Sequence, residues 1–229
     1  MDDNQIDVIA IDGPAGSGKS TTARLVAQKL CFIYLDTGAM YRALTYKVLT
    51  RNIDVQDQSE ILGLIKDTTI EFRAQKSRIR VFLDDKDITR KIRLQKVSLN
   101  VSTIAAYKGV REWMVKMQRQ IGEQGKIVAE GRDIGTVVFP HARLKIFLIA
   151  SLEQRAKRRQ KEFSREGRPV HLNKIADELK KRDSKDSSRE IGPLRQADDA
   201  ILLDTSNLTI EQQVEFVVEQ WNKKVSREL

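Results

Sequence analysis

The chain has 229 residues, 40% hydrophobic and 32% charged, a composition typical of a globular protein with one or two domains. No apolar run reaches the ~18 residues of a membrane-spanning helix, and a single cysteine excludes an intrachain disulfide and a cysteine-rich metal site, so we expect a cytoplasmic protein without a membrane partner. The net charge of +9 leaves two classes open, a nucleic-acid-binding protein and an enzyme that handles phosphates.

The N-terminal stretch predicts a strand, a glycine-rich loop and a helix, in that order. The run Ile6–Ile11 is largely apolar and long enough for one buried strand. It leads into Gly13–Ser20, which matches the Gly-x-x-x-x-Gly-Lys-Ser pattern, and the spacing of Ala23, Ala27 and Leu30 then predicts a helix. Because this is the context that the pattern requires, we expect the chain to bind a nucleotide polyphosphate.

The residue types of this loop explain how it would hold phosphates. Its glycines let successive backbone N–H groups turn toward an anion, and the new helix points its positive end at the same place. Lys19 adds a point charge for the outer phosphates, and the Ser20 hydroxyl is a ligand for Mg²⁺. The predicted donor site comprises Gly13, Pro14, Ala15, Gly16, Ser17, Gly18, Lys19, Ser20 and Thr21.

Further apolar runs predict the remaining strands of one sheet, at residues 32–35, 126–130, 144–149 and 200–203. Helical spacing predicts helices at 40–48, 59–66, 94–105 and 110–121, two charged helices before the last strand, and a final helix over 210–221. Strands that alternate with helices favour a parallel five-stranded α/β sheet covered by helices on both faces. Cys31, after the first helix, is expected to be buried as a small apolar residue.

Residues 70–83 show a different period from the rest of the chain. Apolar residues alternate over 70–74 and again over 79–83, which predicts an antiparallel hairpin, and Asp84–Asp87 predicts a turn after it. A hairpin inside a chain of alternating strands and helices favours an insertion, a small antiparallel subdomain at the edge of the main sheet.

Polar side chains follow directly after two of the predicted strands. Asp36 and Thr37 end the second strand, and Arg132 and Asp133 lie between glycines after the strand at 126–130. Because open α/β sheets bind their ligands at the carboxyl ends of the strands, we expect both groups at the ligand-facing edge.

Basic residues concentrate between the last two strands. Residues 151–190 hold 13 basic and 8 acidic side chains, which is more than half of the basic surplus of the chain. Arg182, Asp186 and Arg189 recur at helical spacing, so one helix face would present two guanidinium groups around a carboxylate. Spacing alone leaves open an ion-pair ladder or a carboxylate that binds a ribose hydroxyl. The loop 166–169 suits a small mobile cover over the site.

No dedicated general base stands out at a strand end. His141 and His171 lie outside the strand-end motifs, and we assign them surface or structural roles. A phosphate monoester needs no base to act as an acceptor, because it is already a dianion near neutral pH. The sequence therefore favours a phosphate acceptor over an alcohol.

Four motifs, in this order, resemble the bacterial cytidylate kinase (CMP/dCMP kinase) family of P-loop nucleoside monophosphate kinases. They are Ile11–Pro14 leading into the loop, Leu35–Arg42, Glu130–Pro140 and Lys181–Arg189, and the resemblance covers essentially the whole chain. The loop alone marks a superfamily, whereas the string Gly-Arg-Asp-Ile-Gly-Thr-Val-Val-Phe-Pro in the third motif is far more specific.

The resemblance implies a reaction and a set of site residues. The reaction is Mg²⁺-dependent transfer of a phosphoryl group from ATP to CMP or dCMP, which gives ADP with CDP or dCDP. Matched motif by motif, the residues that bind the acceptor are Thr37, Arg42, Ser102, Arg111, Arg132, Asp133, Asp186 and Arg189, with cytosine read by Ser102, Arg111 and Asp133. The resemblance adds Arg158 to the ATP site and assigns phosphoryl transfer to Lys19, Arg132, Arg182 and Arg189.

The resemblance also implies an organisation. We expect a single P-loop kinase domain over 1–229, with an NMP-binding insertion at about 60–108 and a short lid at about 155–170. We expect a monomer that acts on small nucleotides and has no stable nucleic-acid partner. Two alternatives stay open: a P-loop kinase with another acceptor, such as a UMP/CMP kinase or a small-metabolite kinase, and a nucleic-acid-binding P-loop protein.

Overall fold

The structure is a computed structural model, and it describes residues 6–75, 78–123, 125–165, 167 and 169–226. The chain divides into two compact units, Met1–Asp36 with Arg119–Leu229 (unit 1) and Thr37–Gln118 (unit 2). The segment expected as an insertion, 60–108, falls inside unit 2. Residues 166 and 168, within the expected lid and its mobile loop, lie outside the described residues.

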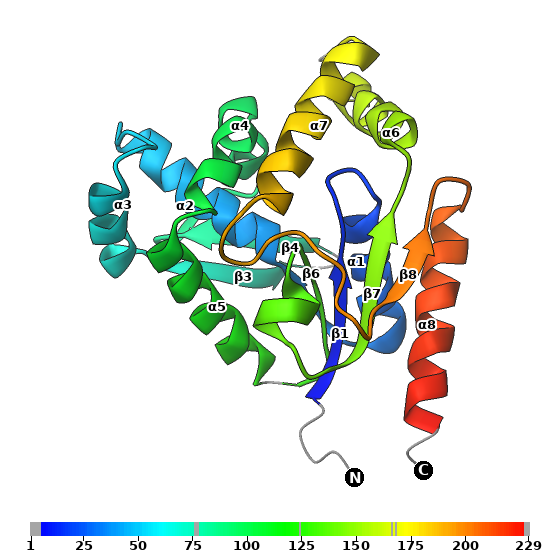
Figure 1. Ribbon diagram of the computed structural model, residues 1–229. Coiled ribbons are helices and arrows are strands. Elements are labelled where there is room, and N and C mark those ends of the chain that lie inside the picture. Colours follow the sequence, from blue (N-terminus) through cyan, green and yellow to red (C-terminus); the bar gives the residue numbers. More distant parts are fainter. Residues whose placement is uncertain (1–5, 76–77, 124, 166, 168, 227–229) are drawn as a thin grey trace. The chain divides into compact units, whose positions relative to one another are not determined.

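Unit 1 is built on a five-stranded sheet with the strand order β2-β6-β1-β7-β8 (Figure 1). Neighbouring strands in it are parallel. The strands are β1 (Ile6–Asp12), β2 (Ile33–Asp36), β6 (Ile127–Gly131), β7 (Ala142–Ile149) and β8 (Ile201–Asp204). The predicted parallel five-stranded sheet is confirmed.

Burial follows the position of each strand in this sheet. Val8 and Ile11 of the central strand β1 are fully buried. The edge strands are more open, with Ile33 of β2 41% exposed and Leu202 of β8 51% exposed. The apolar run at 32–35 is typical of a buried strand, but only Leu35 and Asp36 of β2 are buried, because only one side of β2 has a neighbouring strand.

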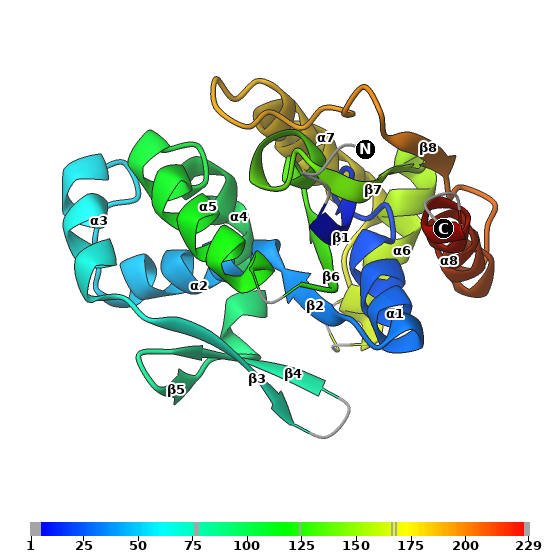
Figure 2. The same cartoon turned by 90° about the horizontal axis from the view of Figure 1, so that it is seen from below.

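Helices α1 (Lys19–Leu30) and α8 (Ile210–Ser226) lie side by side against this sheet (Figure 2). Val26, Val217 and Trp221 share one hydrophobic core with the strands, and the Phe32 ring meets Trp221 edge-on at 5.2 Å between centroids. This core holds α1 in place. Helix α1 directly follows residues 13–18, the glycine-rich loop predicted to bind phosphates, which is called the phosphate-binding loop below. Among the described residues, no helix combines the length and the apolar character that a membrane crossing requires.

Helices α6 (Leu152–Arg165) and α7 (Leu172–Ser187) stand beyond the carboxyl ends of β1 and β7 (Figure 1). Ala156, Ile175 and Leu179 from this pair are buried together with Ala15 of the phosphate-binding loop. This second, smaller core fastens both helices to the loop.

Cys31 is exposed, so the expectation that it is buried was wrong. It follows the last residue of α1 and has left-handed backbone angles, with φ 56° and ψ 38°. Its N–H caps carbonyl oxygens of the last turn of α1, so the position serves the helix end through its backbone rather than the core through its side chain.

Unit 2 combines helices with a three-stranded antiparallel sheet. The helices are α2 (Thr37–Thr50), α3 (Gln58–Leu64), α4 (Gln95–Ile104) and α5 (Lys108–Gly122), with short 3₁₀ turns at Ile65–Asp67 and Lys91–Arg93, and α5 continues into unit 1. The strands, in the order β3-β4-β5, are β3 (Ile70–Gln75), β4 (Arg78–Leu83) and β5 (Lys86–Asp87). The predicted hairpin is confirmed as β3 and β4.

Two boundaries in unit 2 differ from the predicted ones. The turn expected over Asp84–Asp87 is only two residues long, because Lys86–Asp87 pairs back onto β4 as β5. The helix expected over 59–66 begins after Asp57, whose side chain accepts the N–H of Glu60 at 2.9 Å, and it tightens into a 3₁₀ turn after Leu64.

Candidate active site

The phosphate-binding loop joins β1 to α1 in unit 1. Gly13 has a φ of +153°, and a Cβ added there would lie 2.1 Å from the carbonyl oxygen of Leu148 on β7, so no side chain fits. Gly18, the N-cap residue of α1, has a left-handed φ of 97°. These conformations wrap the loop around the N-terminus of α1, which favours a bound anion.

Lys19 is the first residue of α1 and is 7% exposed. Its ammonium group donates to the carbonyl oxygen of Pro14 across the loop at 3.1 Å. Burial, followed by the charge of Arg132, lowers the pKa of Lys19 to about 7. The Ser17 hydroxyl is buried and has no hydrogen-bond partner among the described residues, whereas Ser20 is exposed. A buried cation and an orphaned hydroxyl fit a loop that closes on a polyphosphate.

Two arginines of α6 donate hydrogen bonds to backbone carbonyl oxygens of this loop. Arg155 donates to the carbonyl oxygen of Ala15 at 3.1 Å and forms an ion pair with Asp183 of α7. Asp183 also accepts the N–H of Ala15 at 3.4 Å. Arg158, predicted to contact ATP, donates to the carbonyl oxygen of Ser17 at 3.0 Å. In this structure both guanidinium groups therefore support the loop backbone.

The carboxylate of Asp186 is 1% exposed and lies among three arginines. Arg132 donates to its Oδ2 at 2.8 Å, Arg189 pairs with its Oδ1, and the Arg182 Nε lies 3.9 Å from Oδ2. Burial alone would raise the pKa of Asp186, but the charges of the three arginines outweigh it and lower the pKa to about 2. Because three guanidinium groups share one carboxylate, this three-arginine cluster keeps a surplus of positive charge. That surplus suits a negatively charged phosphoryl group.

The cluster is built differently from the predicted helix face. Helix α7 ends at Ser187, so Arg189 lies beyond the helix and reaches back to Asp186. The donor at 2.8 Å, Arg132, comes from the end of β6, 54 residues away in the chain. Helical spacing could indicate that Arg182 and Asp186 are neighbours, but it carries no information about this long-range partner.

A π-helical turn, Ile134–Val138, follows Arg132 and Asp133 at the end of β6. Asp133, one of the residues predicted to read cytosine, is 5% exposed. The carboxylate of Asp12, the last residue of β1, accepts the first two N–H groups of the turn at 2.9 and 2.8 Å. Burial raises the pKa of Asp12 to about 7, although these two hydrogen bonds act in the opposite direction.

Four predicted acceptor residues lie in unit 2. Thr37 and Arg42 come from α2, Ser102 from α4 and Arg111 from α5. Arg111 is the most buried of them at 2% exposure, and its guanidinium group donates to the carbonyl oxygen of Ala105 at 3.5 Å and lies 5.9 Å from the ring centroid of Tyr41. Arg111 thus joins the end of α4, α2 and α5 within this unit.

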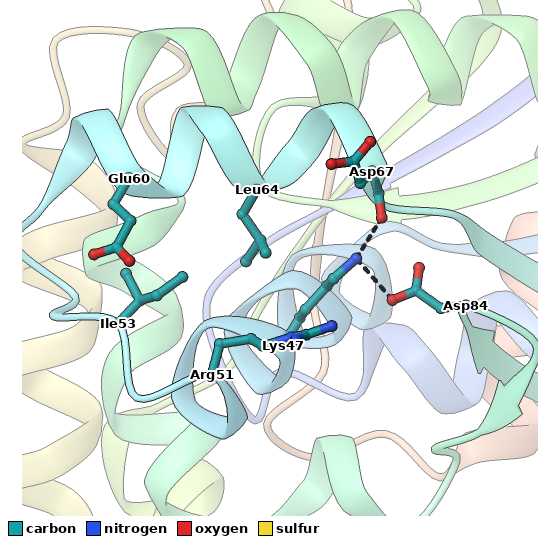
Figure 3. A pocket seen from close by; sticks show the side chains of 7 residues that line it. All are labelled: Lys47, Arg51, Ile53, Glu60, Leu64, Asp67 and Asp84. Atoms are coloured by element: carbon teal, nitrogen blue, oxygen red, sulfur yellow. Dashed lines mark hydrogen bonds and ion pairs between the residues drawn. The ribbon is translucent and has the colours of Figure 1, made fainter.

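Unit 2 also contains a surface pocket of about 580 Å³ (Figure 3). Its lining residues are Lys47, Arg51, Ile53, Glu60, Leu64, Asp67 and Asp84. The Lys47 ammonium group donates to the Asp67 backbone carbonyl oxygen at 2.6 Å and pairs with the Asp84 carboxylate at 2.7 Å. These contacts tie α2 to both ends of the segment that contains the hairpin, and none of the predicted acceptor residues lines this pocket.

Within the described residues, no group of three His, Cys, Asp or Glu side chains is placed to hold a metal ion. Unit 1 instead presents the exposed hydroxyl groups of Ser20 and Thr21 on the first turn of α1, next to Lys19. This donor set suits Mg²⁺ that arrives with phosphate ligands.

The model of the cytidylate kinase family matches residues 9–223 of this chain. The chain belongs to the cytidylate kinase family. A cytidylate kinase of Bacillus subtilis (strain 168) is 47% identical, over 94% of this chain and 96% of that protein. A cytidylate kinase of Streptococcus sanguinis (strain SK36) is 49% identical, over 96% and 98%. A bifunctional pantoate ligase/cytidylate kinase of Prochlorococcus marinus (strain AS9601) is 48% identical, over 96% of this chain and 44% of that protein.

Three side chains to which no sequence pattern assigns a role support these segments of the cytidylate kinase family member. Asp12 holds the turn after β6, and Arg155 with Asp183 holds the phosphate-binding loop. A weak signal existed for Asp12, because an acid that ends a buried strand lies at the ligand-facing edge. Asp183 lies within a motif of the family, Lys181–Arg189, but its contact with Ala15 spans 168 residues and leaves no local pattern.

Proposed function

We propose that this protein transfers the γ-phosphoryl group of Mg²⁺-bound ATP to the phosphate of CMP or dCMP. The bond between Pγ and the β–γ bridging oxygen breaks, and a phosphate oxygen of CMP bonds to Pγ, so the products are ADP and CDP. One observation carries the proposal. Asp183 of α7 accepts the N–H of Ala15 in the donor loop at 3.4 Å, and Arg182 and Asp186 of the three-arginine cluster lie on the same helix, so α7 joins the cluster to the loop.

The donor half of the proposal rests on the loop itself. Its backbone geometry and the N-terminus of α1 favour the β- and γ-phosphates, and Lys19 would neutralise charge on them. Ser20, exposed on the first turn of α1, would be the protein ligand of Mg²⁺. The metal would lower the negative charge on the phosphates.

The acceptor half rests on arginines rather than on a base. The phosphate of CMP is a dianion near neutral pH, so no side chain needs to remove a proton from it. Two anions must nevertheless approach each other, and Arg132, Arg182 and Arg189 supply positive charge where that happens. Asp186 orients these guanidinium groups, and its 1% exposure favours this ordering role over a direct contact with ribose.

Selectivity for cytosine is assigned to Ser102, Arg111 and Asp133. A hydroxyl and a guanidinium group can donate to O2 and N3 of the base, and a carboxylate can accept from the 4-amino group. Uracil carries a carbonyl oxygen in place of that amino group, so an acceptor would face the buried carboxylate of Asp133, which costs about 1–3 kcal/mol. Thr37 and Arg42 are assigned to the acceptor on the strength of their motif alone.

A panel of acceptors tests the proposal in a coupled assay of ADP formation. CMP, dCMP, UMP, AMP and shikimate are supplied in turn with Mg²⁺ and ATP, and kcat/KM is measured for each. We expect CMP and dCMP to be the best substrates. Equal values for UMP and CMP would contradict cytosine selectivity, and a preference for shikimate or AMP would support a P-loop kinase with another acceptor.

Replacement of Lys19 tests the donor assignment. Lys19→Ala should lower kcat at least ~100-fold, because a positioned cation at the transferring group is lost, while the circular dichroism spectrum stays unchanged. Lys29→Ala, at the exposed end of the same helix, is the matched control and should retain normal turnover. Near-normal turnover by Lys19→Ala would overturn the assignment of the donor site.

A further inference from the structure

The end of β1 carries a buried carboxylate that the proposed chemistry does not use. The Oδ1 of Asp12 accepts the N–H of Ile134 at 2.9 Å, and its Oδ2 accepts the N–H of Gly135 at 2.8 Å. These are the first N–H groups of the π-helical turn, which have no acceptor within the turn. Asp133, the N-cap residue of the turn, makes no side-chain cap bond, so Asp12 supplies the cap from a different element.

The other end of the same turn is held by Arg119. Its Nε donates to the carbonyl oxygen of Val138 at 3.0 Å, and its Nη2 donates to that of Val137 at 2.7 Å. A carboxylate at the start and a guanidinium group at the end match the polarity of a helical backbone. The middle of the turn is closely packed, because a Cβ added at Gly135 would lie 3.1 Å from Cδ of Lys145.

The turn connects two parts of the site within unit 1. Asp12 directly precedes Gly13, where the phosphate-binding loop begins, and the turn directly follows Arg132 and Asp133. We propose that Asp12 is a positioning residue for the acceptor: its two hydrogen bonds fix the backbone after Asp133 relative to the loop, and so set the directions of the Arg132 and Asp133 side chains. This inference rests on the proposed function, and it assigns Asp12 no contact with either nucleotide.

Asp12→Asn is the direct test, because asparagine keeps the shape but turns an NH₂ group toward one of the two backbone N–H groups. We expect kcat/KM for CMP to fall ~10- to 100-fold and the preference for CMP over UMP to shrink. The KM for ATP should stay within about twofold, because the loop keeps its own contacts. Initial rates with each nucleotide varied in turn, together with calorimetric titration of CMP, measure these quantities separately.

A matched control exists on the same strand. Asp7 lies at the opposite end of β1, is 37% exposed and pairs with Arg143 at 2.9 Å. Asp7→Asn should therefore leave the constants for ATP, CMP and UMP unchanged. Arg119→Gln, which changes an exposed side chain at the other end of the turn, should weaken CMP and spare ATP, as Asp12→Asn does.

Three results would overturn the proposal. In the first, Asp12→Asn lowers the melting temperature but leaves the CMP constants and the CMP:UMP ratio unchanged, which would make Asp12 purely structural. In the second, the constants for ATP and CMP fall in parallel, which would place the disturbance in the loop. In the third, Asp12→Asn does not fold and Arg119→Gln has normal CMP kinetics. Failure of the proposed function would look different, as a wild-type protein that does not phosphorylate CMP.

Discussion

At the scale of single residues, the three-arginine cluster makes the stability of the protein depend on pH. The pKa of Asp186 falls from its ordinary 3.8 to about 2 in the folded protein. Its charged form therefore stabilises the fold above pH ~4, and this contribution, about 2 kcal/mol, is lost as the pH falls toward 2. Asp186→Asn should lower the free energy of unfolding at neutral pH by about 3–5 kcal/mol, because it also removes the buried negative charge that pairs with Arg132 and Arg189.

Urea denaturation of both proteins between about pH 3 and pH 7 measures this effect. The difference in unfolding free energy between wild type and Asp186→Asn should shrink below pH ~4, where the wild-type carboxylate gains its proton in the unfolded state. Asp199→Asn is the control, since Asp199 is 64% exposed and pairs with Lys145 at 2.8 Å, and it should cost less than ~1 kcal/mol. A difference for Asp186→Asn that is constant over the whole range would contradict the prediction.

Arg111 allows a test of the cytosine assignment inside unit 2. Arg111→Ala should reduce the ratio of kcat/KM for CMP to that for UMP about tenfold, because a donor to the base is lost, and should leave ATP affinity unchanged. Lys108→Ala removes a cation that is 71% exposed from the same helix and should change neither value. Parallel losses for CMP and ATP would assign Arg111 a structural role, through its contact with Ala105.

At the scale of elements, two glycines with open space around them should respond in opposite ways. A Cβ added at Gly63 in α3 or at Gly125 before β6 meets no atom within 4 Å. Gly63→Ala should stabilise the protein by up to ~1 kcal/mol, because alanine is the better helix former. Gly125→Ala should destabilise it by about 1 kcal/mol, because φ is 71° there. Chemical denaturation of the two variants measures both signs, and a shared sign would contradict the argument.

Hydrophobic periodicity predicts some elements of this fold and not others. The strands of the main sheet and the hairpin β3–β4 follow from alternating or continuous apolar runs, which are local properties of the chain. The pairing of Lys86–Asp87 as β5 and the exposure of Ile33 depend on which strand lies alongside, and that information is not local. The π-helical turn at Ile134–Val138 donates two hydrogen bonds to Asp12, more than 120 residues away, so no short window of sequence contains both partners.

At the scale of the whole molecule, the order of the motifs indicates the family, while the contacts between the motifs come only from the structure. Arg132 and Asp186 stand out in the sequence as members of separate motifs, but their 2.8 Å contact requires the fold. The resemblance assigns Arg158 to the ATP site, but it carries no information about the hydrogen bond from Arg158 to the Ser17 carbonyl oxygen. A motif indicates which residues matter, and tertiary packing decides which of them act on each other.

The net charge of +9 is the remaining property of the whole molecule, and some of the basic side chains already pair with carboxylates within the fold. Carboxylates pair with Arg73, Arg80, Arg132, Arg143, Arg155, Arg159, Arg189, Lys47, Lys145 and Lys157. A protein that binds nucleic acid needs cations free to contact successive phosphates along a surface. The guanidinium groups of the three-arginine cluster instead gather around one buried carboxylate, an arrangement that favours a small phosphate ligand over a polymer.

We accordingly predict that a single-stranded oligonucleotide is not a specific ligand. Fluorescence anisotropy at about 50 mM salt should show at most weak binding, which disappears at about 200 mM because it rests on released counterions alone. An excess of the oligonucleotide at the higher salt concentration should leave CMP turnover unchanged at saturating ATP. Tight binding that survives about 200 mM salt, or inhibition that CMP relieves, would revive the nucleic-acid-binding alternative and would place the polymer at the acceptor site.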